Sequence, residues 1–364
     1  MSQCFRRIWY TLQVQVRMNG GSTSRPAVSV VVPTHNRAPS LRRTLEALAA
    51  QSYAVDRFEG LVVANGCTDD TAAMVRALAM PFALKLVELP TSGANLARNA
   101  GASMARGDLL LFLDDDVEPL PGLVDVHART QGSARDLIAM GPYLPPPLPR
   151  PPSLLAERLW RLSNMSASIP ELLAEWKGPL DWVWFIGGNF SISKALFESV
   201  GGFDGTLSRH EDWEFGCRAQ KTGARFVFMP KAGAYHYPHE NRSLAQYLRN
   251  ARSEGRSDVA ITHRHPEIVD RLAIGRAAQP RTTLGRLGRW LAFDHPQAGD
   301  VAVNTLMIAS YTLNRLRMRQ PWNRLVDCIY DYWYLRGVAE GLGKGAAVAA
   351  YIEHLRRAAT SHSP

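Results

Sequence analysis

The sequence predicts an α/β fold: a doubly wound, mostly parallel sheet followed by a helical C-terminal region. Two observations predict it. Short runs rich in valine, leucine and isoleucine alternate with longer runs that have the apolar spacing of helices. Polar loops follow the short runs, and one of these loops begins with three consecutive aspartates. In open parallel sheets ligands bind beyond the carboxyl ends of the strands, so we expect the functional site in these loops.

The first half of the chain predicts four strands separated by three helices. The strands are rich in β-branched residues or leucine, and Ser40 is expected to cap the first helix. Strands and helices that alternate in this way form a sheet with helices on both faces. The predicted order is a strand at residues 27–32, a helix from Ser40, a strand at 58–64, a helix at 71–80, a strand at 83–89, a helix at 93–105 and a strand at 109–113.

The last of these strands leads directly into Asp114, Asp115 and Asp116. Five consecutive apolar residues are typical of a short strand that is buried on both faces. Adjacent carboxylates repel one another, so the cluster needs a cation, arginines or bulk water. One interpretation is a divalent-metal site that holds a phosphate-bearing ligand. The other is a solvated acidic turn or a helix cap, and the residues alone leave both open.

The second half is less regular. Residues 142–152 are rich in proline and are predicted to be extended and outside the core. Alternation over residues 187–193 predicts another strand, and the chain after about residue 241 is predicted to be helical. We therefore expect three parts: a poorly ordered extension at residues 1–26, an α/β domain at 27–240 and a helical region at 241–364. The sequence leaves open whether Met1 or Met18 is the true start.

Charge is unevenly distributed along the chain. The formal net charge is +9, and most of it lies after Arg249, where arginines outnumber acidic residues. A basic segment indicates an anionic partner such as lipid headgroups, a phosphate-bearing substrate or nucleic acid, or simply a solvated helical surface. No nucleic-acid recognition motif accompanies the charge, so no nucleic-acid partner is expected.

The four cysteines are scattered and form no CxxC pair, which argues against a zinc site or a disulfide framework. The longest late uncharged run, residues 301–314, is shorter than the roughly 20 apolar residues that a spanning helix needs. The N-terminus has no apolar segment typical of a signal peptide. We expect a cytoplasmic protein, with contact to the inner face of the membrane as a hypothesis.

Five segments, taken in order, resemble the inverting nucleotide-sugar glycosyltransferases of family 2, which have the GT-A fold. No single segment is decisive, but five in the same order are specific. The resemblance covers roughly residues 27–240 and implies a hexosyltransferase-like enzyme of cell-envelope polysaccharide or glycolipid biosynthesis. The segments are SVVVPTHNR, VVANGCTDDT, ANLARNAGASMARGDLLLFLDDDVEP, GGNFSISKALFESVGGFD and HEDWEFGCRA.

The resemblance implies that the three aspartates are the DXD motif of the family. Asp116 is then the expected ligand of Mg²⁺ or Mn²⁺, which neutralises the leaving pyrophosphate. His236 is a candidate further ligand, or alternatively a structural histidine or an acceptor contact. Asp114 and Asp115 are expected to hold the ribose or donor sugar, or to support the metal through water.

The donor implied by the resemblance is a nucleoside-diphosphate sugar, most often a UDP-sugar. The chain departs from the family pattern at Ala64-Asn65, where family members often have Asp-Asp or Asp-Asn, and this puts the identity of the base in doubt. Arg98 either reaches the nucleotide or is a surface arginine. The residues predicted to bind the donor are Pro33, Thr34, Asn36, Arg37, Asn65, Arg98, Asp114 and Asp115.

The family also implies that one member of the Glu211-Asp212 pair is the general base that takes a proton from the acceptor hydroxyl. We favour Asp212, with Glu211 second, although a helix N-cap is the ordinary role of an aspartate in this position. The glycan or glycolipid acceptor is expected to contact Gly188, Asn189 and Trp213.

Rival interpretations are a nucleotidyltransferase of the same fold and a catalytically inactive carbohydrate- or lipid-binding protein. A nucleotidyltransferase would need a glycine-rich phosphate loop after the first strand, and this chain has none there. The three aspartates and the Glu211-Asp212 pair argue against an inactive binding protein. Arginines interleaved with aromatic residues predict membrane contact by the C-terminal third, or else helices that pack on the catalytic domain or form a dimer. The aromatic residues concerned are Trp322, Tyr332, Trp333 and Tyr334. The oligomeric state is not predicted.

Overall fold

The computed structural model describes residues 15–19, 26–132, 134–147, 152–167, 179–238, 243–277, 282–343 and 348–361. Its contacts divide the chain into two compact units. The sheet unit comprises residues 1–148, 159–206 and 211–241, and the helical unit comprises residues 149–158, 207–210 and 242–364. The predicted boundary near residue 241 falls where the last part of the helical unit begins, but two short earlier segments also belong to that unit.

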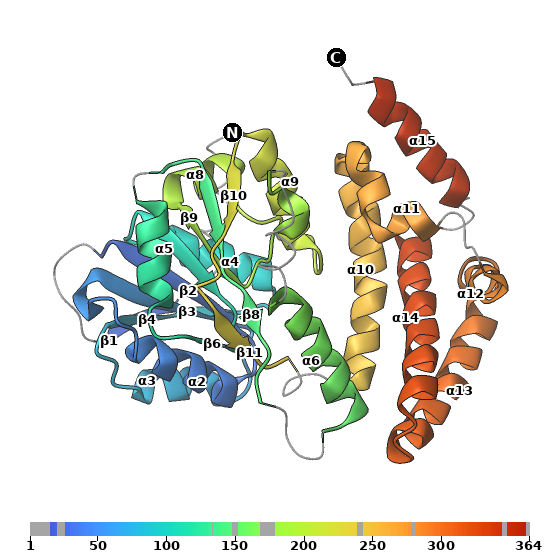
Figure 1. The fold of residues 1–364 in the computed structure, drawn as a ribbon, viewed down its shortest axis with the longest axis horizontal. Helices are drawn as coiled ribbons and strands as arrows, with labels where there is room; N and C mark the ends of the chain where they lie inside the picture. The colour runs from blue at the N-terminus through green and yellow to red at the C-terminus, as the bar shows by residue number, and fades with distance from the viewer. Residues whose placement is uncertain are drawn as a thin grey trace. The chain divides into compact units, whose positions relative to one another are not determined.

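The main sheet of the sheet unit has the strand order β1-β4-β3-β2-β5-β9-β7-β10 among the described residues (Figure 1). Strands β2 to β5 are parallel to one another, whereas β1 and β9 run antiparallel to their neighbours. The predicted mostly parallel α/β sheet is therefore confirmed. The strands are β1 (Gln15–Asn19), β2 (Val28–Thr34), β3 (Phe58–Asn65), β4 (Ala83–Leu89), β5 (Leu109–Leu113), β7 (Leu137–Met140), β9 (Asn189–Ser193) and β10 (Arg225–Phe228).

A second, three-stranded sheet joins segments that are far apart in the sequence. It has the order β6 (Val117–Pro119), β11 (Ala234–His236) and β8 (Tyr143–Leu144). Strand β6 begins shortly after β5 ends, so this small sheet extends from the aspartate loop. It aligns His236 with Val117 across an antiparallel pair.

Helices cover both faces of the main sheet. Side chains of α2, α3 and α5 pack on one face, and α4 packs on the other. The helices and 3₁₀ turns in and around the sheet unit are α2 (Ala38–Ala49), η2 (Val55–Arg57), α3 (Thr71–Ala77), α4 (Ala94–Met104), α5 (Leu123–Gln131), α6 (Leu154–Ala167), η3 (Trp182–Trp184), α8 (Lys194–Val200) and α9 (Glu211–Lys221).

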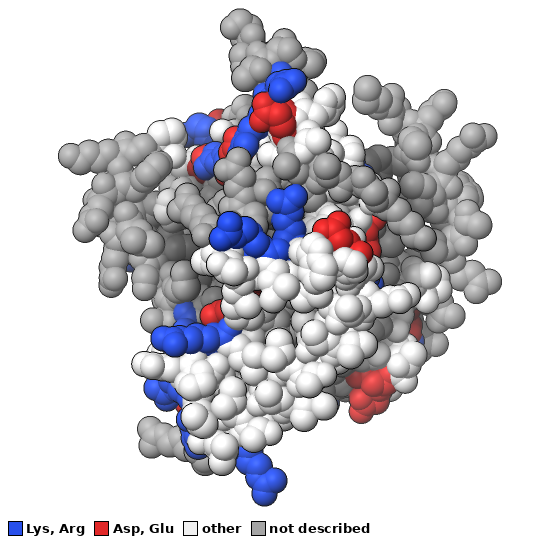
Figure 2. Space-filling view, turned by 90° about the vertical axis from the view of Figure 1, so that its right-hand side faces the viewer, with Lys and Arg blue, Asp and Glu red and all other residues white. Residues whose placement is uncertain are grey.

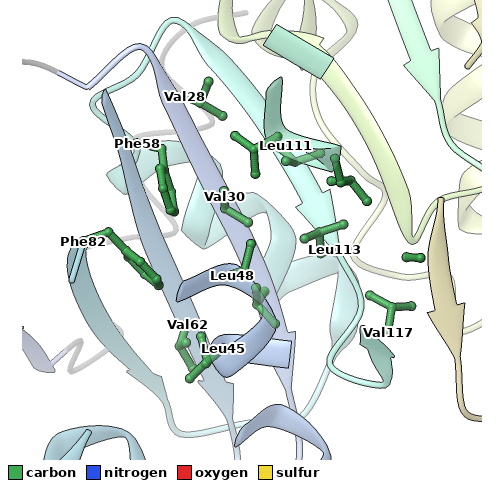
Figure 3. Close-up of a cluster of buried hydrophobic side chains, with 14 of the residues drawn as sticks. Val28, Val30, Leu45, Leu48, Phe58, Val62, Phe82, Leu111, Leu113 and Val117 are labelled. Carbon is green, nitrogen blue, oxygen red and sulfur yellow. The ribbon is translucent and has the colours of Figure 1, made fainter. Parts of the chain in front are cut away.

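The core of the sheet unit follows the alternation of its strands. Val28 and Val30 of β2 point to the α2 side, as do Leu111 and Leu113 of β5 (Figure 3). The intervening Phe112 points the other way and stacks on Phe190 of β9, with ring centroids 4.8 Å apart. Strand β5 is thus buried on both faces, as predicted, and this fixes the position at which its aspartates emerge.

Two local predictions are wrong. Ser40 does not cap α2, because the helix begins at Ala38 with a proline at its start, and the Ser40 hydroxyl instead donates to the Asp115 carbonyl. The segment predicted to be non-core contains the buried Tyr143, which belongs to β8. Within the extension predicted to be poorly ordered, β1 pairs with β4, and the other residues up to 25 lie outside the described residues.

The helical unit is built around α10 (Leu244–Arg264) and α14 (Arg319–Leu342), which pack against each other. Leu244, Leu248, Ile329 and Val338 are buried in this unit, whereas Trp333 is half-buried. Its other helices are η4 (Pro266–Arg271), α11 (Ala273–Ala277), α12 (Thr283–Phe293), α13 (Pro296–Arg315) and α15 (Val348–Ser361).

The aromatic residues of α14 are mostly part of this core. Trp322, Tyr332 and Tyr334 are buried, and the Tyr332 and Tyr334 hydroxyls donate to Asp300 and Asp258. These three aromatic side chains therefore pack inside the unit rather than on a surface that could meet lipid, whereas Trp333 is half-buried. Among the described residues, no helix is long and apolar enough to cross a membrane.

Gly101 gives a test of how tightly the sheet unit packs. A Cβ at this position of α4 would lie 2.4 Å from Cγ1 of Val31 in β2. We expect Gly101→Ala to lower the free energy of unfolding by about 1–3 kcal/mol, because the helix would have to move away from the sheet. Urea denaturation measures this. Ser103→Ala, at an exposed position of the same helix, is the control and should change stability little. An equal stability of the two variants would contradict the close approach of α4 to the sheet.

Candidate active site

Strand pairing positions the first aspartate. Leu113 pairs with Asn189 across β5 and β9, so the next residue, Asp114, lies beside Gly188 and its backbone N–H donates to the Gly188 carbonyl (3.1 Å). A Cβ on Gly188 would lie 2.2 Å from Asp114 Oδ2 and 1.8 Å from the Tyr143 hydroxyl oxygen. Only glycine therefore fits between these groups. Gly188 shapes the site through its lack of a side chain, which the acceptor-contact prediction did not anticipate.

Asp115 points inward. Its carboxylate accepts hydrogen bonds from the Thr34 hydroxyl and from Arg37 Nη1, both at 2.7 Å. Its carbonyl accepts from the hydroxyls of Ser40 and Thr44. The side chain is almost fully buried, so Asp115 ties β2 and α2 to the end of β5. Asp115 and Thr34, both predicted to bind the donor, are therefore occupied with each other.

Asp116 lies beside His236. Its Oδ1 is 3.5 Å from His236 Nε2, and Oδ2 is 3.3 Å from Arg37 Nη1. The second sheet explains this proximity, because it pairs His236 with Val117, the residue after Asp116. The His236 ring also stacks on Tyr143, with centroids 4.3 Å apart, which fixes its orientation. The two predicted metal ligands are thus brought together.

Two arginines balance the charge of the aspartates. Burial raises the pKa of Asp115 to about 6, and Asp116 adds to this rise while Arg37 opposes it. Burial alone would lower the pKa of Arg37, but Asp115 and Asp116 outweigh it and raise the pKa. Arg37 was predicted to line the nucleotide site, and the structure shows that it also forms ion pairs with Asp115 and Asp116.

Arg98 is the second arginine, and it is neither exposed nor free. From α4 it donates through Nη2 to Asp114 Oδ1 (2.8 Å) and through Nη1 to Glu211 Oε1 (3.0 Å). Its side chain is only 7% exposed, so the surface alternative is wrong. Burial opposes ionisation, yet Asp114 and Glu211 raise the pKa of Arg98 above its usual value. Arg98 therefore connects the aspartate loop to the start of α9.

Asp212 lies in the first turn of α9, where acidic residues are favoured by the helix dipole. Its Oδ1 accepts the backbone N–H of Trp213 at 2.9 Å. A Cβ on Gly187 would be 3.0 Å from the Asp212 Cβ, so Asp212 packs on Gly187 just as Asp114 packs on Gly188. The two predicted acidic groups thus pack on two adjacent glycines. Trp213 packs edge-on against the buried Trp182.

The loops after β2 and β3 are linked to each other. Asn36 has a positive φ of 54°, and its Oδ1 accepts the backbone N–H groups of Thr68 (2.7 Å) and Asp69 (3.2 Å). Asn65 Nδ2 donates to the carbonyl of Thr34, and its Oδ1 accepts the N–H of Gly93. Both asparagines therefore hold the loops in shape. Pro33 lies within β2, paired with Val63.

Asn189 does not lie where an acceptor could reach it. Its side chain is fully buried, Nδ2 donates to the Ala232 carbonyl (2.8 Å), and Oδ1 lies 3.2 Å from His127 Nε2. Burial lowers the pKa of His127 to about 4, so this histidine is neutral. The acceptor prediction is wrong for Asn189, because strand alternation turns its side chain into the core.

Sequence analysis missed Tyr143 and Thr44. The Tyr143 hydroxyl donates to Asp114 Oδ2 (3.2 Å), and the Thr44 hydroxyl donates to the Val117 carbonyl (2.6 Å). Tyr143 stands in a proline-rich segment that gives no strand pattern. Thr44 was detectable as a polar residue between Leu41 and Leu45 on the apolar face of α2.

Arg98→Met tests the buried connection. It leaves Asp114 and Glu211 without their partner, and we expect the free energy of unfolding to fall by about 3–5 kcal/mol. Arg225→Met is the matched control, because the ion pair of Arg225 with Asp136 is exposed and should contribute little. Chemical denaturation of both variants makes the comparison. If both substitutions changed the free energy of unfolding by the same small amount, the role assigned to Arg98 would be contradicted.

Comparisons with known proteins agree with this geometry. The sequence profile of glycosyl transferase family 2 matches residues 29–197, and that of the N-terminal domain of galactosyltransferase matches residues 171–240. Together these ranges contain every predicted site residue.

Two curated relatives are validoxylamine A glucosyltransferases from Streptomyces hygroscopicus. The one from subspecies jinggangensis is 32% identical over 70% of this chain, and the one from subspecies limoneus is 31% identical over 70%. The matched regions span 65% and 60% of the length of these relatives. A mannosyltransferase from Pyrobaculum calidifontis, solved in complex with GDP-Man and Mn²⁺, is similar in fold, with a TM-score of 0.53. The two sequences are 18% identical, and the match covers 94% of this chain and 93% of the mannosyltransferase chain.

Proposed function

The chain belongs to glycosyltransferase family 2, and on that premise we propose that it transfers a sugar from a nucleoside-diphosphate sugar to an acceptor hydroxyl with inversion. The observation that carries the proposal is the arrangement around Gly187 and Gly188. Asp114 packs on one of these glycines and Asp212 on the other. An inverting transfer needs a group that holds the donor and a base on the acceptor side, and this arrangement supplies an acidic group for each.

We assign the acceptor side to Asp212. Its neighbour Glu211 accepts from Arg98 Nη1 and is thereby tied to the aspartate loop, and we take Asp212 as the group that accepts the proton of the acceptor hydroxyl. The hydrogen bond from the Trp213 N–H to Oδ1 orients the group, and Oδ2 lies on the side of Gly187. Trp213, at the same helix start, offers an aromatic face for a sugar ring.

We assign the divalent metal to Asp116 and His236. A carboxylate oxygen and an imidazole nitrogen 3.5 Å apart form a donor pair that suits Mn²⁺ or Mg²⁺ completed by phosphate oxygens and water. When bound, the ion would neutralise charge on the departing pyrophosphate. The stacking of His236 on Tyr143 and the contact of Asp116 with Arg37 hold both groups in place beforehand.

The donor side is formed by the loops after β2 and β3. Arg37 is partly exposed, with 30% of its side chain accessible, so its guanidinium can also meet a phosphate. The Pyrobaculum relative of similar fold was solved with GDP-Man and Mn²⁺, and the Streptomyces relatives are named as glucosyltransferases. These names support a nucleoside-diphosphate hexose as the donor class. The asparagine at Asn65 leaves the choice of base open.

Asp212→Asn separates chemistry from binding. The amide cannot accept the proton, so we expect kcat to fall by about 10²–10⁴ while donor affinity stays close to that of the wild type. Release of nucleoside diphosphate from a panel of sugar nucleotides, with calorimetry of donor binding, measures both quantities. Asp136→Asn, at an exposed position of the same unit, is the control. Unchanged turnover in Asp212→Asn would remove this residue as the base.

Asp116→Ala tests the metal assignment by binding rather than by turnover. We expect Mn²⁺ to stop strengthening donor binding in this variant, because one of its two protein ligands is gone. Titration of Mn²⁺ by electron paramagnetic resonance, with and without nucleoside diphosphate, measures the effect. His236→Ala should weaken Mn²⁺ binding less than Asp116→Ala does, because the histidine substitution removes no negative charge. Wild-type Mn²⁺ affinity in both variants would place the metal elsewhere.

A further inference from the structure

The helical unit has an apolar surface on α12 and α13 that the described residues leave uncovered. Helix α12 buries only Ala292, and α13 buries only Gly299, Val303 and Ser310 among the described residues. Large apolar side chains point outward instead: Leu287 is 48% exposed and Ile308 is 69% exposed. We refer to this surface as the α12–α13 face, defined by Leu284, Leu287, Trp290, Val301, Ile308 and Tyr311.

These residues form stripes rather than scattered positions. Leu284 and Leu287 are three residues apart on α12, and Trp290 follows at the same spacing. On α13, Val301 and Ile308 are two turns apart. Helices α12 and α13 pack against each other and against α14, so both stripes belong to one folded unit. Contiguous exposed apolar stripes of this kind usually meet a partner.

Positive charge accompanies the apolar stripes. The segment from Thr282 to Arg319 contains five arginines and only two aspartates, Asp294 and Asp300. Asp300 is already engaged, because it accepts from the Tyr332 hydroxyl (2.6 Å) and from Arg336 (3.3 Å). Figure 2 shows a broad area without charged residues, with basic residues mainly on its left border and acidic residues on its right border. The arginines are Arg286, Arg289, Arg315, Arg317 and Arg319. Arg317 and Arg319 pair with Glu157 of α6, at 3.5 Å and 2.8 Å.

We propose that the α12–α13 face docks onto the surface of an anionic lipid membrane. Leucine, isoleucine, tryptophan and tyrosine on one side of a helix with arginines beside them are the composition of helices that lie in the headgroup region. No described helix spans a membrane, so the contact is peripheral. A second copy of the chain fits less well, because a two-fold contact would bring the same arginines face to face.

The surface differs from the aromatic residues of α14 that the sequence indicated. Trp322, Tyr332 and Tyr334 lie in the core of the unit, whereas the apolar residues of the α12–α13 face were not singled out from the sequence. Three of the arginines beside the face, Arg315, Arg317 and Arg319, belong to the membrane hypothesis that the sequence suggested. The proposal does not depend on the proposed sugar transfer, because lipid binding is measured without donor or acceptor. A negative result for membrane docking would therefore leave the proposed sugar transfer unaffected, and the reverse also holds.

Flotation of the full chain with vesicles tests the proposal. We expect the chain to float with phosphatidylcholine–phosphatidylglycerol vesicles at low salt and far less with phosphatidylcholine alone. The double variant Leu287→Glu with Ile308→Glu should lower the floated fraction by about tenfold or more, because carboxylates would face the lipid. Leu162→Glu is the matched control, since Leu162 is 47% exposed on α6 and should leave flotation unchanged.

A second double variant tests the contribution of the arginines to vesicle binding. Arg286→Glu with Arg315→Glu should remove the preference for anionic vesicles and its dependence on salt. Circular dichroism checks that each variant is folded. If the double glutamate variant is unfolded, the double variant Leu287→Ser with Ile308→Ser is used in its place. Absence of flotation in the wild type, or flotation that the apolar variants do not reduce, would overturn the proposal. A dimer detected by light scattering and lost in the apolar variants would also overturn it, by assigning the face to a second copy.

Discussion

The site depends on the pairing of three consecutive carboxylates with two arginines from different helical segments. Asp115 and Asp116 are buried side by side, and Arg37, at the start of α2, contacts both. Asp114 is contacted by Arg98 from α4, on the opposite face of the sheet. Buried charges of one sign are tolerated only when they are paired. The aspartate loop can therefore fold only when helices on both faces of the sheet are in place, so the fold and the site are formed together.

Arg98 extends this dependence to the acceptor side. It contacts Glu211 at the start of α9, and the residue after Glu211 is the proposed base. Gly187 and Gly188 complete the arrangement, because a side chain at either position would separate the acidic groups that pack on them. The donor and acceptor sides are thus connected by one buried arginine and by two residues without side chains. A substitution at any of these positions would alter the relative placement of the two sides without removing a reacting group.

The sheet and the acidic residues could be predicted from the sequence, because local patterns determine them. Strands β4 and β5 have the predicted bounds, and the aspartates follow β5 as expected. The partners of those aspartates could not be predicted in the same way. Whether Arg98 is buried depends on acids from two other segments, and whether Asn189 faces the core depends on the register of β9 against β5. Strand β1 was detectable, since Val14, Val16 and Met18 alternate with polar residues, but the basic N-terminus obscured it.

The small sheet has a consequence for how this chain can vary. Asp116 precedes β6 and His236 ends β11, and the antiparallel pairing of these two strands brings the two side chains together. The long stretch between them contributes mainly helices and further strands, together with Tyr143 of β8, which stacks on His236. Insertions or deletions in the connecting loops would therefore leave the pair unchanged, whereas a shift of one residue in the β6–β11 register would turn the imidazole to the opposite side of the sheet. Evolution can remodel the loops between Asp116 and His236 as long as this short ladder keeps its alignment.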